Sequence, residues 1–283
     1  MILIADSGST KTSWVLIDGK NVIQTINTIG YNPYYFKNDE LLLTIKAELL
    51  PIIKEYKIEK IFFYGSGCSS NENCSIVSNS LSKLFTDSII EIQHDLYGAA
   101  LALLNDNEGI ACILGTGSNS CYWDGKKIIS NVPSVGYLLG DEGSGNYIGM
   151  KILKGILEEK APDEIITKFY NSHNTTFDEV LNRIYNEEEP TRFISEVGKF
   201  AGLNINNSWI YSAVKQSFFD FIENQLIMYQ NYQSLPVSFT GSIAYHFKKI
   251  LLEACQERSI KVGKILKNPI DGLVSYHLTK ISK

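Results

Sequence analysis

The chain has 283 residues, of which 44% are hydrophobic and 20% charged, a composition typical of folded globular proteins rather than disordered ones. Its 31 acidic and 26 basic side chains give a formal net charge of −5, which disfavours nucleic-acid binding because that function needs a basic surface. The longest apolar run, residues 99–104, is much shorter than the roughly 20 residues of a membrane-spanning helix, so no membrane partner is expected.

Cysteine and histidine spacing predicts neither a disulfide framework nor a metal cage made of protein ligands. The five cysteines are odd in number and form no C-x-x-C pair. The four histidines show no H-x-x-x-H spacing. The first residues contain no basic stretch and no small-residue cleavage site. We therefore expect reduced thiols and a cytoplasmic location.

The first half of the chain predicts alternating strands and helices. Residues 2–6 predict a strand that ends in a polar turn, and two further strands complete a three-stranded meander. Apolar residues at helical spacing predict a helix near 39–56, which Pro51 is expected to kink or shorten. The other predicted elements are strands at 14–18, 22–28, 61–64 and 88–92 and helices near 73–85 and 95–104.

The second half begins in the same way, with a strand, a turn rich in Gly, Ser and Thr, and another strand. Asp124-Gly125 predicts a hairpin, and a mostly helical stretch follows from Gly143 to about Gln233. The other predicted elements are strands at 110–114, 119–123, 126–130 and 236–240, a helix from 242 to about 258 and an apolar stretch at 270–278. Strands that alternate with helices predict the α/β class.

The turn after the first strand has the pattern Asp6-x-Gly8-x-Thr10-x-Thr12. Glycine lets the backbone approach a ligand, successive N–H groups form a cradle for an anion, and the hydroxyls add donors. A carboxylate beside a phosphate needs a cation between them, and Mg²⁺ prefers one or two carboxylates together with phosphate oxygens and water. The alternative is an ordinary hairpin turn that the Asp6 side chain caps.

A second turn of this kind, Gly115-Thr116-Gly117-Ser118, follows the strand at 110–114. Two such turns in two half-molecules can hold a polyphosphate from both sides, so the pair predicts phosphate binding more strongly than either turn alone. Gly241-Ser242 lies between a strand and a helix, where small residues allow a nucleoside to lie against the helix N-terminus. Ordinary turns are the alternative for all of these segments.

Three carboxylates complete the candidate chemistry. Asp95 follows a strand and begins a helix, so it is either a helix cap or a general base, with His94 as a local partner. Asp141 and Glu142 lie between glycines just before a helix, where carboxylates can accept paired hydrogen bonds from sugar hydroxyls. A glycine-rich helix cap explains that spacing equally well.

The order of these motifs resembles the N-acetylglucosamine kinase family, which belongs with the BadF/BadG/BcrA/BcrD ATPases in the sugar kinase, actin and chaperone ATPase superfamily. The resemblance covers essentially the whole chain, and its most specific part is Leu139-Gly140-Asp141-Glu142-Gly143-Ser144. It implies an α/β fold of two ribonuclease-H-like (actin-like ATPase) domains around a nucleotide cleft. The implied domains are residues 1–108 joined by the returning segment 270–283, and residues 109–269 with a helical insert at about 143–233.

Carried over by position, the resemblance implies a role for each motif. Asp95 corresponds to the catalytic base, and Asp6 lies near Mg²⁺. The residues implied to face the sugar are Asn32, Asn119, Asp141 and Glu142. The residues implied to bind ATP are Gly8, Ser9, Thr10, Lys11, Thr12, Gly115, Thr116, Gly117, Ser118, Gly241 and Ser242.

Two segments depart from the family pattern. Pro133-Ser134-Val135-Gly136 stands where the family has Gly-Gly-Trp-Gly. That part of the family pocket touches the sugar, so the departure puts the identity of the sugar in question. Ser242 replaces the second glycine of the adenosine turn, which is a small change that the turn should tolerate.

We therefore expect a kinase that uses ATP and Mg²⁺ to phosphorylate an amino sugar, most simply the 6-hydroxyl of N-acetylglucosamine. The sugar is the expected small-molecule partner, and a homodimer stays open. The main alternative is the ATPase activator of an iron–sulfur 2-hydroxyacyl-CoA dehydratase or benzoyl-CoA reductase, which needs cluster-ligating cysteines at a subunit interface. The segment around Asp95 carries no cysteine. An ATP-binding protein without catalysis has no support while Asp95 is present.

Overall fold

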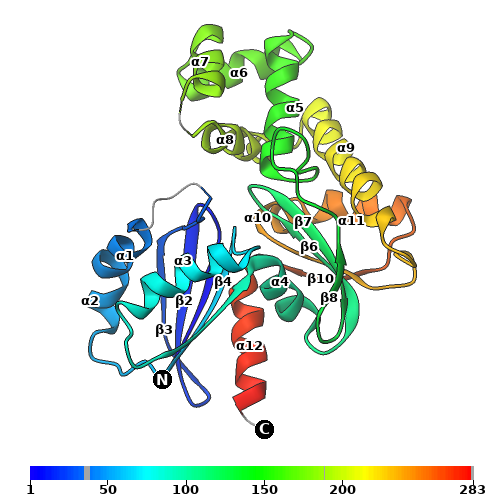
Figure 1. Ribbon diagram of the computed structural model, residues 1–283. Coiled ribbons are helices and arrows are strands. Elements are labelled where there is room, and N and C mark those ends of the chain that lie inside the picture. The colour runs from blue at the N-terminus through cyan, green and yellow to red at the C-terminus, as the bar shows by residue number, and fades with distance from the viewer. Residues whose placement is uncertain (35–38, 188, 282–283) are drawn as a thin grey trace. The chain divides into compact units, whose positions relative to one another are not determined.

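The structure, a computed structural model, describes residues 1–34, 39–187 and 189–281 (Figure 1). The chain divides into two compact units, each with its own five-stranded sheet and hydrophobic core. Unit 1 consists of Met1–Asn107, Gly125–Ile128 and Asn268–Lys283, and unit 2 consists of Glu108–Asp124 and Ile129–Lys267. The α/β class is confirmed.

Unit 1 has a mixed sheet in the order β3-β2-β1-β4-β5. β1 (Ile2–Ser7) pairs antiparallel with β2 (Lys11–Asp18), and β2 pairs antiparallel with β3 (Asn21–Ile29), which confirms the predicted meander. β4 (Lys60–Gly65) runs parallel to β1, and β5 (Ile89–His94) runs parallel to β4. The carboxyl ends of β1, β4 and β5 therefore share one edge of the sheet.

The predicted helix near 39–56 is built from three consecutive pieces. They are α1 (Glu40–Thr44), a π-helical turn at Ile45–Leu49 and α2 (Leu50–Ile53). Pro51 has no N–H to donate, and it lies in the first turn of α2, where a helix needs no such donor. The segment therefore accommodates Pro51 because a new helix begins after the π-helical turn.

Three longer helices complete unit 1: α3 (Asn71–Ser82), α4 (Asp95–Leu104) and α12 (Pro269–Ile281). The C-terminal helix α12, red in Figure 1, packs against α4, β1 and β2 although it is distant from them in sequence. One buried link is the 2.8 Å hydrogen bond between the Tyr64 hydroxyl and His277 Nε2. On β2, Trp14 lies 5.8 Å from the Phe63 ring and donates its indole N–H to Thr28.

Unit 2 has the strand order β10-β9-β6-β7-β8. β6 (Glu108–Leu114) pairs antiparallel with β7 (Ser118–Asp124), and β8 (Ile128–Asn131) follows at the edge. β9 (Val237–Thr240) runs parallel to β6, and β10 (Val262–Leu266) runs parallel to β9. β10 was not predicted, because it is a short edge strand with a register shift and no fully buried residue.

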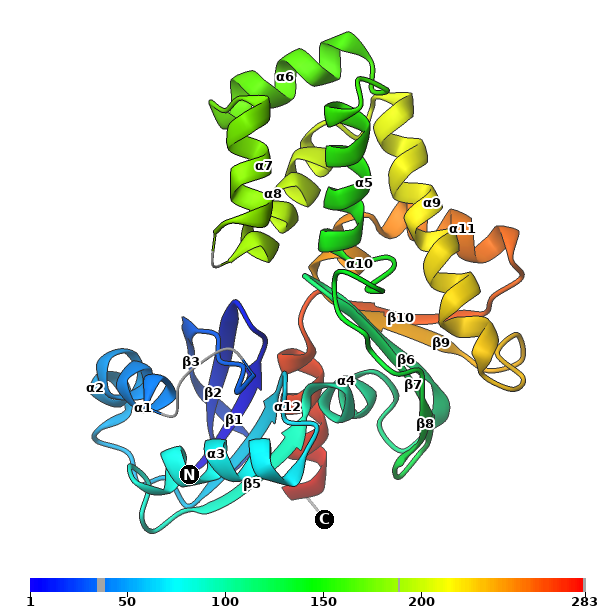
Figure 2. The same cartoon turned by 45° about the horizontal axis from the view of Figure 1, so that its top comes forward.

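The chain between β8 and β9 is mainly helical. Its helices are α5 (Gly145–Leu157), α6 (Asp163–His173), α7 (Phe177–Tyr185), α8 (Pro190–Leu203) and α9 (Ser208–Asn224), with a 3₁₀ turn at Leu226–Met228. In Figures 1 and 2, α5 to α8 gather beyond one end of the unit 2 sheet. Within the ranges that the structure describes, no helix is long and apolar enough to cross a membrane.

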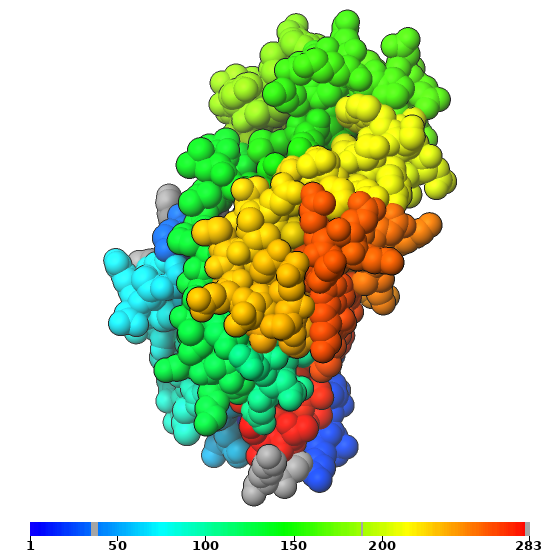
Figure 3. Space-filling view, turned by 90° about the vertical axis from the view of Figure 1, so that its right-hand side faces the viewer, coloured from blue at the N-terminus to red at the C-terminus, as the bar shows by residue number. Residues whose placement is uncertain are grey.

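The predicted helix from 242 to about 258 is divided at Phe247 into α10 (Ser242–His246) and α11 (Lys248–Glu257). α11 packs against α9, and Figure 3 shows α9 in yellow and α11 in orange on one face. Two ion pairs join these helices, Lys215 with Glu257 at 2.7 Å and Arg258 with Glu223 at 2.6 Å. Both pairs are solvent-exposed, so the contact depends mainly on the apolar residues beneath them.

Candidate active site

The first glycine-rich turn connects β1 to β2 in unit 1. The backbone N–H of Gly8 donates to the Lys11 carbonyl at 3.0 Å and closes the turn. Gly8, Ser9, Thr10 and Lys11 are exposed, so this turn is accessible to a ligand. This exposure is what an anion cradle requires.

Thr12 differs from the other residues of that motif. Its hydroxyl is buried and lies 2.7 Å from the Ser7 hydroxyl, with which it shares a hydrogen bond. The Ser7 hydroxyl also donates to the Tyr31 carbonyl at 3.3 Å. Thr12 therefore supports the turn from inside the unit, where its hydroxyl already has a hydrogen-bond partner.

Asp6 and Asp95 lie close enough in unit 1 for their charges to interact. Burial, and after it the charge of Asp95, raise the pKa of Asp6 to about 7 against the opposing effect of Lys11. Asp6 is near the end of β1 and Asp95 directly follows β5, so the parallel strands bring both to the same edge. A divalent cation beside these carboxylates would offset both the cost of burying their charges and the repulsion between them.

Among the described residues, no group of three or more His, Cys, Asp or Glu side chains could hold a metal ion. Mg²⁺ in proteins keeps several waters and takes one or two carboxylates together with phosphate oxygens. Asp6 is the carboxylate that the sequence analysis assigns to this ion.

Asp95 is the first residue of α4 and is partly exposed. Its Oδ1 accepts a hydrogen bond from the Leu96 backbone N–H at 2.7 Å. His94 is the N-cap residue of α4, and its Nε2 lies 3.2 Å from the same oxygen. The predicted local partnership between His94 and Asp95 is therefore present.

Asn32 is buried beside the first turn. Its amide donates to the Ser9 hydroxyl at 3.2 Å and to the Ser66 hydroxyl at 3.5 Å. Its carbonyl oxygen accepts from the Tyr34 backbone N–H at 3.0 Å, which forms an Asx turn across Pro33. The residue that the resemblance assigns to the sugar is thus linked directly to the turn assigned to phosphate.

In unit 2, the start of α5 holds the second glycine-rich turn. The N–H groups of Gly145 and Asn146 donate to the carbonyls of Gly115 and Thr116 at 2.8 and 3.1 Å. The N–H of Gly115 donates to the Gly117 carbonyl at 2.9 Å. The first N–H groups of α5, which have no partner within the helix, thus hold the turn in place. The Thr116 side chain remains exposed.

Asp141 packs directly onto this turn. Its Oδ1 accepts from the Ser118 backbone N–H at 3.2 Å, and a Cβ at Gly117 would lie 2.9 Å from its Oδ2. Asp141 has φ +59°, in the left-handed region that a non-glycine residue rarely adopts. Burial raises the pKa of Asp141, and the Ser118 N–H lowers it. The backbone strain and the hydrogen bond together fix the direction of this carboxylate.

Several buried polar atoms of unit 2 have no hydrogen-bond partner among the described residues. They are Ser118 Oγ, Thr240 Oγ1, Asn146 Oδ1, Glu142 Oε2 and Ser217 Oγ. Ser118 and Thr240 are neighbours across the end of β6, since they pair with Leu114 and Ile113. Buried polar atoms normally have partners, so these groups indicate where a polar ligand or water binds. Asn119, the other predicted sugar residue, uses its Oδ1 to accept from the Ser120 N–H at 2.9 Å.

The junction of β9 and α10 requires a glycine. Gly241 has φ +120°, and a side chain there would overlap the Leu114 carbonyl. Its N–H donates to the Leu266 carbonyl at 3.1 Å, and Ser242 next to it is exposed. The structure thus joins the Gly241-Ser242 turn to the end of β6, directly before the Gly115–Ser118 turn.

Asn146, whose side-chain oxygen is one of these unpartnered atoms, was missed by sequence analysis. Only 3% of the residue is exposed. The available signal was an amide directly after Ser144-Gly145, at the start of a helix whose first N–H groups usually meet a polar partner. The segment that replaces the family tryptophan is also distinctive. Val135 within it is exposed, as are Leu138 and Leu139 just after it.

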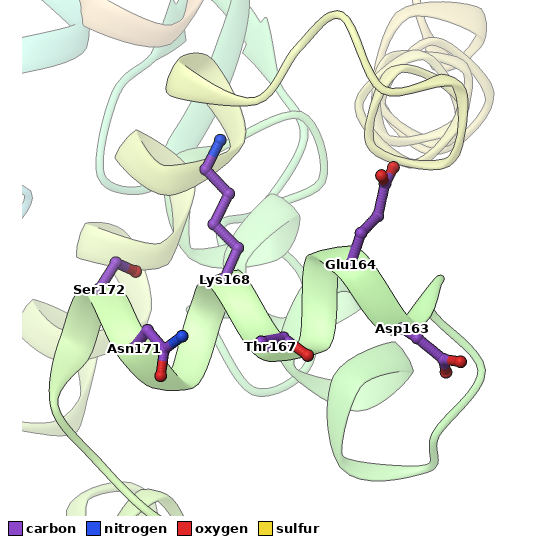
Figure 4. Close-up of a pocket in the computed structure, with 6 residues that line it drawn as sticks. All are labelled: Asp163, Glu164, Thr167, Lys168, Asn171 and Ser172. Atoms are coloured by element: carbon purple, nitrogen blue, oxygen red, sulfur yellow. The ribbon is translucent and has the colours of Figure 1, made fainter.

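A surface hollow of about 700 Å³ lies apart from these motifs in sequence, along one side of α6. It is lined by Asp163, Glu164, Thr167, Lys168, Asn171 and Ser172 (Figure 4). Every lining residue belongs to one helix, and Glu164 already accepts a hydrogen bond from the Asn207 amide at 2.7 Å. The hollow brings no groups together from different elements, so the glycine-rich turn and carboxylates within each unit are the better candidates.

The chain was compared with known protein families, curated proteins and solved structures. No protein-family model matches the chain. An N-acetyl-D-glucosamine kinase of Dictyostelium discoideum is 25% identical over 178 residues, which are 56% of this chain and 54% of that protein. The match therefore spans about half the length of this curated relative.

Two crystal structures that carry the name "putative N-acetylglucosamine kinase" match much more of the chain. The protein from Porphyromonas gingivalis is 35% identical, covers 99% of both chains and has a TM-score of 0.95. The protein from Chromobacterium violaceum is 13% identical, covers 97% of this chain and 98% of its own, and has a TM-score of 0.78, which shows the common fold. Because the first relative matches at 35% identity along both whole chains, this chain belongs to the N-acetylglucosamine kinase family of the actin-like ATPase superfamily.

Proposed function

We propose that this protein transfers the terminal phosphoryl group of ATP to an amino sugar, with N-acetylglucosamine as substrate and its 6-hydroxyl as acceptor. Family membership supports the reaction class. The observation that carries the proposal is the pair of carboxylates Asp6 and Asp95 at the carboxyl edge of parallel strands, beside an exposed glycine-rich turn. Asp6 would bind a cation, and Asp95 would accept the proton of the sugar hydroxyl.

Nucleotide binding is assigned to the two glycine-rich turns and the β9–α10 junction. The exposed turn Gly8–Lys11 and the Gly115–Ser118 turn, whose Thr116 side chain is exposed, would hold phosphate oxygens, and Lys11 adds a positive charge. The unpartnered hydroxyls of Ser118 and Thr240 support a polar ligand at that end of β6. Gly241 and Ser242 would bind the adenosine part, because a glycine there keeps the backbone open.

Asp6 would hold Mg²⁺, which supplies charge neutralisation of the phosphate oxygens when bound. Asp95 would then act as the general base. The O–H bond of the sugar hydroxyl breaks, its proton passes to Asp95, and the oxygen forms a bond to phosphorus as ADP leaves. Because the transition state of phosphoryl transfer is loose, these residues act mainly by position and charge.

The sugar is assigned to Asn32 in unit 1 and to Asn119, Asp141 and Glu142 in unit 2. Asp141 suits paired hydroxyls because its direction is fixed by Ser118 and by its own backbone. Glu142 has a buried oxygen without a partner among described residues, which suits a further hydroxyl or amide donor. The protein's partner is then a small-molecule sugar, and we place the reaction in the cytoplasm, where ATP is available.

The test is release of ADP by the purified protein with Mg²⁺ and ATP in the presence of single sugars. The panel contains N-acetylglucosamine, glucosamine, mannosamine, N-acetylmuramate and glucose. N-acetylglucosamine should give the highest kcat/KM, and glucose, which lacks the amide, should be far poorer. Equal release with every sugar, or release that ignores sugar, would reject the proposed activity.

The dehydratase-activator function is disfavoured by where the cysteines lie. All five belong to the described residues, and Cys68, Cys112, Cys121 and Cys255 are buried. Cys74 is partly buried and its thiol donates to the Cys68 carbonyl at 3.5 Å. A cluster held at a subunit interface needs accessible thiolates. Burial instead raises the pKa of Cys68 to about 12, which keeps it protonated.

A further inference from the structure

Four residues of unit 2 are joined by one continuous chain of hydrogen bonds. Ser120 Oγ, on β7, donates to Gln225 Oε1 at 3.0 Å, so its single proton is used. Ser120 Oγ therefore accepts from the Tyr229 hydroxyl, 2.8 Å away. The Tyr229 oxygen in turn accepts from the Val132 backbone N–H at 3.1 Å. The Tyr229 hydroxyl thus links β7 to the residue that directly follows β8.

Tyr229 is well suited to hold this position. Only 5% of the residue is exposed, and burial raises the pKa of its hydroxyl, so the group keeps the proton that it donates to Ser120. Gln225 and Tyr229 flank the 3₁₀ turn that follows α9. Breaking any link in such a chain leaves a buried polar group without a partner, so the chain holds its members in one arrangement. Val132 therefore has a fixed place.

The segment that begins after Val132 has little else to hold it. Residues 133–136 are exposed. Residues 133–135 make no hydrogen bond among the described residues. The next fixed point is the Gly136 carbonyl, which accepts from the Gly140 N–H at 2.8 Å. Segment 133–136 is therefore anchored at its two ends, through Val132 and through Gly136.

The far end of this segment lies beside the residues assigned to the sugar. Val135 packs closely against Gly140, since a Cβ there would lie 2.8 Å from Val135 Cγ2. Gly140 directly precedes Asp141 and Glu142, the two carboxylates of the proposed sugar site. Segment 133–136 thus contacts the backbone that carries both carboxylates, and a shift of the segment would reach them.

We propose that Tyr229 is a positioning residue that determines sugar selectivity, because its hydroxyl anchors segment 133–136 beside Asp141. The inference rests on the proposed function, since it concerns the sugar site of that activity. A wall held in one position favours the sugar that fits it and penalises the others, whereas a mobile wall does both less well. Tyr229 acts through the segment and not by contact with the sugar.

Two substitutions separate this anchoring from stability. Tyr229→Phe keeps the ring but removes the acceptor of the Val132 N–H. Ser120→Ala removes the bonds to Gln225 and Tyr229 but leaves the Tyr229 oxygen to accept from Val132. Both variants leave buried polar groups without partners, so both should lower Tm. Only Tyr229→Phe releases Val132.

The measurement is kcat/KM with each sugar of the activity panel, for the wild-type protein and both variants. In Tyr229→Phe, the preference for N-acetylglucosamine over the other sugars should fall about tenfold, mainly through KM, because correct and incorrect sugars then meet the same mobile wall. Ser120→Ala should keep the wild-type preference. An unchanged preference in Tyr229→Phe, or an equal loss in Ser120→Ala, would overturn the inference.

Hydrogen exchange of the Val132 amide, followed by ¹⁵N NMR, tests the anchor without any activity measurement. The exchange rate should rise about tenfold or more in Tyr229→Phe and stay near the wild-type rate in Ser120→Ala. An unchanged rate in Tyr229→Phe would also overturn the inference. Failure of the proposed function looks different, because the wild-type protein would then release no ADP in response to sugar, and the inference would fall with it.

Discussion

Asp141 Oδ1 accepts a hydrogen bond from the Ser118 backbone N–H at 3.2 Å, so a carboxylate assigned to the sugar is held by a turn assigned to phosphate. Unit 1 contains a matching arrangement, in which the Asn32 amide donates to the Ser9 hydroxyl at 3.2 Å. Within each unit, the two parts of the proposed site therefore share a hydrogen bond. We therefore expect a ligand that moves either turn to move the adjoining residue assigned to the sugar as well.

Asp141→Ala should raise the KM for sugar about ten- to a hundredfold, because a carboxylate that pairs with hydroxyls contributes roughly 1.5–3 kcal/mol. It should also reduce the effect of sugar on ATP affinity, since the Ser118 link is lost. Calorimetry of each ligand with and without the other measures that coupling, which must be equal in both directions. Ligand affinities that are independent in the wild-type protein would contradict this account.

Gly117→Ala tests whether that glycine serves Asp141. The added methyl would lie 2.9 Å from Asp141 Oδ2 and would displace the carboxylate. We expect the KM for sugar to rise about tenfold, which is about 1.4 kcal/mol. The matched control is the same substitution in the Asp141→Ala protein, where the methyl has no carboxylate to meet. An equally large rise in that background would mean that Gly117 acts on the sugar by another route.

Asp95→Asn should lower kcat by about 10²–10⁴ while binding of ATP and sugar is largely retained, because a general base contributes to the chemical step. Steady-state kinetics together with a binding titration separate the two effects. If the variant keeps more than about a tenth of the wild-type kcat, Asp95 is not the base.

Asp6→Ala should increase the Mg²⁺ concentration that gives half-maximal activity, because the carboxylate assigned to the cation is removed. Excess Mg²⁺ should restore part of the activity, since phosphate oxygens and water remain as ligands. The measurement is a Mg²⁺ titration at fixed ATP and sugar. Identical titration curves for variant and wild type would remove Asp6 from the cation site.

His277 predicts how stability depends on pH. Burial is the main cause that lowers its pKa from 6.5 to about 4; Glu91 opposes this and Lys60 adds to it. Between about pH 4 and 6.5, His277 is therefore protonated in the unfolded chain but neutral in the native protein. The free energy of unfolding consequently falls as the pH is lowered through this range. The loss approaches roughly 3 kcal/mol at the acid end.

Urea unfolding across this pH range should show a smaller acid loss in His277→Phe than in wild type. The exposed His246 offers the control, because His246→Gln should leave the pH dependence nearly unchanged. His277→Phe also loses the hydrogen bond to Tyr64, which changes the stability at every pH. Only the slope of the unfolding free energy with pH therefore tests the assignment. Parallel curves for His277→Phe and wild type would refute it.

Much of the fold could be predicted because hydrophobic pattern and turn chemistry agree along most of the chain. The meander of β1 to β3 followed from apolar runs separated by glycine turns, and β4 and β5 were predicted as strands, although their parallel pairing was not. β10 could not be found this way, since a partly exposed edge strand has little apolar pattern. The break of the helix at Phe247 likewise depends on packing that periodicity does not report.

For the candidate site, the sequence located the turns but not the direction of individual side chains. Thr12 belongs to the motif, yet its hydroxyl bonds to Ser7 inside unit 1. Asn146 lies outside the predicted set, yet its Oδ1 is among the unpartnered buried atoms of unit 2. Spacing along a chain gives proximity, whereas the direction of a hydroxyl or amide depends on neighbours that only the folded structure supplies.

The most direct test of the central claim is identification of the product by ³¹P and ¹H NMR after incubation with ATP, Mg²⁺ and N-acetylglucosamine. The account predicts a phosphate ester on the oxygen of carbon 6, formed in equal amount to ADP, and no ester with the 6-deoxy sugar. Formation of ADP with inorganic phosphate but no sugar ester, or an ester that persists with the 6-deoxy sugar, would contradict it.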